Sequence, residues 1–105
     1  MDSNEPYSDQ WHRAALKAND LEGAASLMEN TRSAMLSQWK VKLGDIADNK
    51  AEKIVKASNE WYDLNKRMVD ARSNANAAKI EAEWMKMKYW ESSSDRADER
   101  TMARL

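Results

Sequence analysis

The sequence predicts an all-α protein, a helical hairpin or antiparallel coiled coil with one long C-terminal helix and a short N-terminal helix. Residues that favour helices, such as alanine, lysine, glutamate and methionine, are abundant, and the 105 residues include only two glycines and one proline. Neither glycine nor proline follows Gly44. In that C-terminal stretch apolar residues recur at intervals of three and four, the spacing that places side chains on one helix face.

Length and composition fit one helical domain over residues 1–105. Domains typically contain about 100 to 150 residues. The chain is 42% hydrophobic and 33% charged, a balance typical of helices with one buried stripe and a solvated face. Its net charge is -1, which excludes attraction of the whole chain to nucleic acid or to an anionic membrane. Binding of that kind would need a local patch.

The N-terminal part is predicted to contain a flexible arm followed by a short helix. Residues 1–7 are mostly polar and include Pro6, and we interpret them as the arm. The short helix is predicted over residues 10–18. Asn19 and Asp20 are expected to end it with a turn, because their short side chains accept the free amide hydrogens of a new helix.

A second helix is predicted over residues 21–43. Gly44 is the expected end, since glycine readily adopts the left-handed conformation that closes a helix. The apolar stripe of this helix recurs at spacings of three, four or seven and consists of Leu21, Ala25, Met28, Met35, Trp39, Leu43 and Ile46.

The long helix is predicted over residues 45–105, with possible breaks near residues 58 and 93. Ser58 and Asn59 both cap helices well and compete for backbone hydrogen bonds. The run of serines from Ser92 to Ser94 is the other weak point. Between these two points we expect a nearly continuous helix.

A heptad repeat runs through the long helix and predicts a self-association seam. The repeat is bulky at its ends and alanine-rich in its middle, so an antiparallel neighbour would place alanine against alanine. That neighbour could be the helix over residues 21–43, folded back on the long helix, or the long helix of a second chain. We also predict that the protein is a homodimer. The seam residues are Ile54, Trp61, Leu64, Met68, Ala71, Ala75, Ala78, Ala82, Met85 and Tyr89.

A second candidate surface mixes aromatic and basic side chains near the end of the repeat. Aromatic rings stack on unpaired bases while lysines follow phosphates, so single-stranded nucleic acid is one possible ligand. Aromatic side chains also anchor protein interfaces. The candidate face consists of Lys79, Trp84, Lys86, Lys88 and Trp90.

The residue inventory predicts no enzyme, no metal site and no cofactor. His12 is the only histidine and there is no cysteine, which excludes a histidine-based triad or a multi-histidine or zinc-thiolate site within one chain. Carboxylates such as Glu81 and Glu83 lack an apolar setting that would suit acid–base catalysis.

The N-terminus lacks the pattern of a signal peptide, and no apolar run approaches the roughly 20 residues of a membrane span. These features predict a cytoplasmic protein.

Five segments of the C-terminal half carry a resemblance: KAEKIVKAS (50–58), MVDAR (68–72), ANAAK (75–79), EWMKMKYW (83–90) and the ending near residues 100–105. In these segments the chain resembles a group of small helical proteins of tailed bacteriophages, encoded in the early region near recombination functions. The resemblance implies an accessory role in DNA recombination or replication, through a protein partner in the host cytoplasm. Two alternatives stay open, a phage-encoded inhibitor of a host nuclease or defence complex, and a single-stranded nucleic-acid binder.

Overall fold

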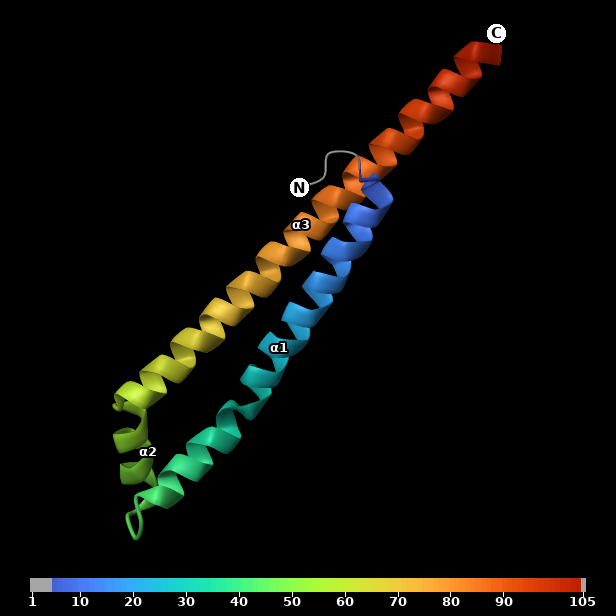
Figure 1. The fold of residues 1–105 in the computed structure, drawn as a ribbon. Helices are drawn as coiled ribbons and strands as arrows, with labels where there is room; N and C mark the ends of the chain where they lie inside the picture. Colours follow the sequence, from blue (N-terminus) through green and yellow to red (C-terminus); the bar gives the residue numbers. More distant parts are fainter. Residues whose placement is uncertain (1–4, 105) are drawn as a thin grey trace.

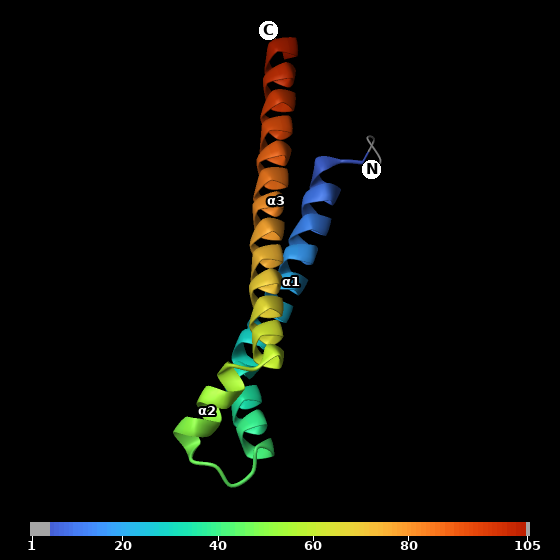
Figure 2. The ribbon, with the colours of Figure 1, turned by 90° about the vertical axis from the view of Figure 1, so that its left-hand side faces the viewer.

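The computed structural model describes the backbone of residues 5–104 and the side chains of residues 5–94. It confirms the all-α class, with three helices and no strand in the described part: α1 (Tyr7–Lys42), α2 (Asp48–Lys56) and α3 (Asn59–Arg104). Figure 1 shows α1 and α3 side by side and antiparallel, with α2 closing one end. At the other end α3 continues beyond α1, as Figure 2 also shows. The molecule is therefore an elongated rod of 83 × 22 × 16 Å.

The predicted turn at Asn19 and Asp20 is wrong, because α1 is a single helix of 36 residues. The predicted helices over 10–18 and 21–43 are thus joined. Ala18 and Ala25 are both buried on the face toward α3, so the apolar stripe continues across the expected break. Continuous packing against α3 outweighs the weak local preference of two exposed polar residues for a cap.

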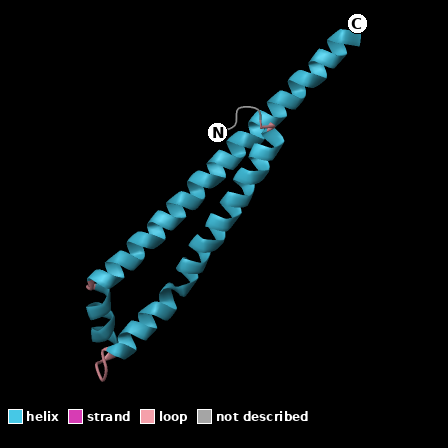
Figure 3. Cartoon of the chain, viewed as in Figure 1, coloured by secondary structure: helices cyan, strands magenta, loops and turns pink. Residues whose placement is uncertain are grey.

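Gly44 ends the first long helix as predicted. It has the positive φ of 83°, and its amide donates to the carbonyl of Val41. The chain then enters α2, which is held to the last turn of α1 by an ion pair of 2.6 Å between Lys40 Nζ and Asp48 Oδ1. Figure 3 shows the short loop between these two helices.

A break near residue 58 is confirmed, and Ser58 explains it. Its hydroxyl accepts a hydrogen bond of 3.2 Å from the amide of Trp61, which caps α3. The same hydroxyl donates to the carbonyl of Val55, at 2.6 Å, in the last turn of α2. The other possible break is not used, since α3 continues through residues 92–94.

The break changes which residue of α2 faces the core. Ile54 was predicted as part of the seam, but its side chain is 42% exposed, whereas Ala51 and Val55 are buried. The heptad count assumed one continuous helix across Ser58, and the turn there shifts the phase of everything before it. The assignment of Ile54 to the seam is therefore corrected.

The antiparallel register of α1 and α3 brings bulky residues together at both ends of the hairpin. Near α2 the rings of Trp39 and Trp61 meet edge to face, with centroids 6.1 Å apart. At the open end Trp11 packs against Tyr89, with centroids 5.6 Å apart. In the middle of the hairpin, between Met68 and Met85 of α3, the buried residues are all alanines, namely Ala18, Ala25, Ala75, Ala78 and Ala82. The large-small-large profile of α3 is thus matched by α1 of the same chain.

Candidate interaction surface

The seam of α3 is covered within one chain. Ala71 and Tyr89 are half-buried, and apart from Ile54 the remaining seven seam residues are buried. Side chains of α1, and Leu43 directly after it, pack against this stripe: Met28, Met35, Leu36, Trp39 and Leu43 near α2, and Ala14 and Leu21 further along. Of the two neighbours that the sequence allowed, α1 folding back fills the position. A second chain does not have that stripe available while α1 remains in place.

A charged cluster fixes the middle of the hairpin along one edge of the seam. The guanidinium of Arg72 donates two hydrogen bonds to the carboxylate of Glu29, at 2.9 and 2.5 Å, and one of 2.5 Å to Glu22. Lys79 Nζ lies 2.9 Å from the same Glu22 oxygen. Two acids of α1 thus meet two bases of α3. The sequence carries a signal for this cluster, because the two acids are seven residues apart and so are the two bases. The sequence analysis did not identify this matching spacing.

The cluster shifts the pKa values of Glu22, Glu29 and Arg72 toward their charged forms. A hydrogen bond from Lys79 lowers the pKa of Glu22, and one from Arg72 lowers the pKa of Glu29. The two carboxylates raise the pKa of Arg72, chiefly through the hydrogen bonds with Glu29. Because Lys79 is one of the five candidate-face residues, part of that face already serves to hold α1.

The five residues of the candidate face lie on two flanks of α3. Lys86 follows Lys79 by seven residues, which places it on the flank that pairs with α1. On the other flank the ammonium of Lys88 lies 5.3 Å from the ring centroid of Trp84, a cation–π contact, and 3.6 Å from Glu91. Trp90 packs edge to face on Tyr89, with centroids 5.4 Å apart.

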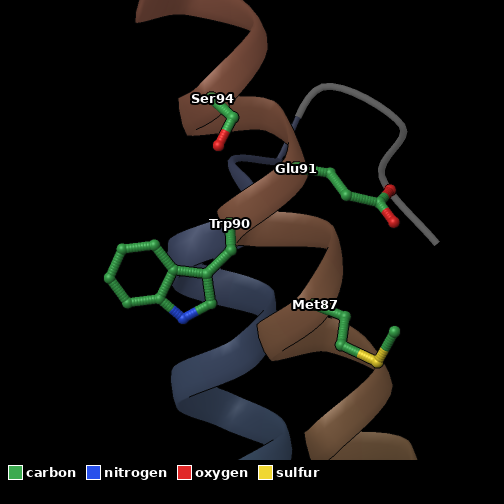
Figure 4. Close-up of a pocket in the computed structure, with 4 residues that line it drawn as sticks. All are labelled: Met87, Trp90, Glu91 and Ser94. Atoms are coloured by element: carbon green, nitrogen blue, oxygen red, sulfur yellow. The ribbon is translucent and has the colours of Figure 1, made fainter.

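A shallow hollow lies beside Trp90, near the open end of the hairpin. Its lining residues, Met87, Trp90, Glu91 and Ser94, all belong to α3, so no second element closes it. In Figure 4 the ring of Trp90 extends to one side of the helix, and Met87 and Glu91 extend to the other. Such an open surface suits contact with a macromolecule better than enclosure of a small ligand. Met87 was missed, because the prediction followed aromatic and basic residues.

A second hollow of about 290 Å³ lies at the closed end, where the three helices meet. Trp39, Leu43 and Val55 give it an apolar base, and Lys42 and Glu60 contribute charged side chains. The exposed Ile54 also lines this hollow. Its apolar side chains come from α1, from α2 and from the connection between them, so their convergence could not be predicted from a heptad on α3.

The side of α3 away from α1 carries a further row of apolar residues that the sequence analysis did not single out. Tyr62, Val69, Ile80 and Met87 are 67%, 67%, 72% and 58% exposed. Their spacing keeps them on one face of the helix, separated by polar residues. We call this row, together with the intervening Lys66, Ser73, Asn76 and Glu83, the outer stripe.

Comparison of the chain with protein-family models, with curated protein sequences and with solved structures found no match. Over the residues that the structure describes, no helix combines the length and the apolar content that crossing a bilayer requires. The assignment of function therefore depends on the surfaces described above.

Proposed function

We propose that this chain is a non-enzymatic helical interaction protein that binds a protein partner through α3 near the open end of the hairpin. The observation that supports this most is the exposure of Trp84 and Trp90, large side chains that the hairpin itself does not cover. Tryptophan is enriched among the residues that contribute most to protein binding. A rigid two-helix scaffold holds these side chains in place before binding, which lowers the entropic cost of association.

The charges nearby favour a protein over a single-stranded nucleic acid. Lys79 is paired with Glu22, and Lys88 lies between Glu91 and the ring of Trp84. Binding to phosphates depends on cations that can replace counterions along the strand. Two of the three lysines of the candidate face are already engaged with acids of the same chain, so we rank nucleic-acid binding below protein binding.

The biological role that we propose comes from the resemblance to phage proteins. It is an accessory role in DNA recombination or replication in the host cytoplasm. The alternative is inhibition of a host nuclease or defence complex, which would use the same exposed surface. We also propose that the chain acts as a homodimer, although α1 occupies the seam first expected to form it.

A photo-crosslinking amino acid at position 94 tests the proposed binding surface. Ser94 is exposed and lines the hollow beside Trp90, so its replacement leaves the aromatic side chains intact. Position 27 on α1 is the matched control, since Leu27 is also exposed. We expect a discrete cross-linked protein from infected cells at position 94, absent at position 27 and lost when Trp84→Ala and Trp90→Ala are added.

The identity of the cross-linked protein separates the two roles. A phage replication or recombination protein supports the accessory role, and a host nuclease supports the inhibitor. The same cross-links at positions 94 and 27 would contradict the proposal. Salt-sensitive retention of a labelled oligonucleotide, lost in Lys86→Glu with Trp90→Ala, would instead support nucleic-acid binding.

A further inference from the structure

We infer that the outer stripe of α3 is a self-association surface on which α3 of a second copy packs antiparallel. The stripe starts at Tyr62 and ends at Met87, and its eight positions alternate in spacing between four and three residues. This is the spacing of a coiled-coil seam, on the side of α3 away from α1. At 1.5 Å per residue it extends for about 38 Å. The chain thus has two seams on one helix, of which the hairpin fills one.

The outer stripe is complementary to itself when it is reversed. In an antiparallel pair the two-fold axis passes between Ser73 and Asn76. The first position of one copy then lies opposite the last position of the other, the second opposite the seventh, and the third opposite the sixth. Tyr62 then faces Met87 of the second copy, and Val69 faces Ile80. An aromatic ring beside a thioether and two aliphatic side chains in contact are both favourable pairs. Symmetry gives each pair twice.

The polar positions of the stripe fit the same pairing. Lys66 falls opposite Glu83 of the second copy, and Ser73 falls opposite Asn76, which can exchange a hydrogen bond. Within the described residues neither Lys66 nor Glu83 takes part in an ion pair, whereas Arg72, Lys79 and Lys88 on the same helix all do. Both side chains are therefore available to pair with the opposite charge of a second copy.

Charge also selects the orientation. In a parallel pair of α3 helices equal positions face each other, so Lys66 would lie beside Lys66 and Glu83 beside Glu83. Like charges opposite one another destabilise a coiled coil, whereas the antiparallel pairing replaces both repulsions by attractions. Polar layers at the centre fix the register and lower the affinity. We expect a reversible dimer.

Sedimentation equilibrium over a concentration series tests this inference. The unchanged chain should approach twice its 12.1 kDa mass as the concentration rises. Lys66→Glu or Glu83→Lys alone puts like charges at two places in the dimer and should weaken it by about tenfold. The double variant K66E/E83K should restore the affinity. Lys53→Glu on α2 makes the same charge change as Lys66→Glu and should leave the affinity unchanged. Helicity by circular dichroism confirms that each variant is folded.

A chain that stays monomeric throughout the series overturns the inference, and so does a dimer that tolerates both single reversals. Orientation is tested with introduced cysteines, since the chain has none. A mixture of Val69→Cys and Ile80→Cys chains should form disulfide-linked heterodimers. Linkage of V69C chains alone would indicate a parallel dimer. These variants leave Trp84 and Trp90 intact, so failure here does not affect the proposed partner surface.

Discussion

Arg72 donates three hydrogen bonds in the charged cluster between α1 and α3. Its planar guanidinium donates to both oxygens of Glu29 and to Glu22, a geometry that lysine cannot reproduce. The residue is half-exposed, so the cluster is screened by water and its stabilising effect is modest. Its main effect is on register, because it joins the two helices at one defined level.

The cluster makes the hairpin sensitive to acid. The pKa of Glu29 is lowered from its ordinary value of 4.5, so its stabilising contribution is present at higher pH and is lost as the pH falls through the folded-state pKa. We expect the melting temperature, followed by circular dichroism at one protein concentration, to fall between about pH 5 and pH 3. Glu29→Gln should lower the melting temperature by a few degrees at pH 7 and reduce its dependence on acid. An unchanged dependence on pH in this variant would contradict the role of the cluster.

At the scale of elements, the helix ends that local chemistry determines were predictable. Gly44 and Ser58 act through backbone conformation and a cap, and both were identified from residue type. The turn at Asn19 and Asp20 was not correct, because packing of α1 on α3 decides that boundary. Ile54 was misplaced for a related reason, since a heptad counted across a helix break loses its phase.

The two glycines should respond to substitution in opposite directions. Gly44→Ala should destabilise the chain by about 1 kcal/mol, because a side chain at a φ of 83° is strained. Gly23→Ala should stabilise it by about 0.5 to 1 kcal/mol, since Gly23 lies inside α1 and a Cβ there meets nothing within 4 Å. Urea denaturation measures both effects. Equal effects of the two substitutions would show that the positive φ at Gly44 has no energetic importance.

For the whole molecule, the sequence was sufficient for the fold class and for the inner seam of α3. It could not determine whether the same chain or a second one fills that seam, because an alanine-rich stripe accepts any antiparallel neighbour of matching profile. The five residues of the candidate face all belong to α3, but they lie on two of its flanks. The outer stripe was missed because its apolar residues are separated by charged and polar ones.

The measurement that most directly tests whether α1 covers α3 within one chain is disulfide formation between introduced cysteines at positions 25 and 75. Ala25 and Ala75 are both buried, at 0% exposure. They lie at the same level because the contacts of Trp11 with Tyr89 and of Trp39 with Trp61 set this antiparallel register. A25C/A75C should form a disulfide within single chains in dilute solution, detected by mass under non-reducing conditions. A25C/A82C, about 10 Å out of register, should not. A disulfide that forms only between chains, or none at all, would contradict the hairpin.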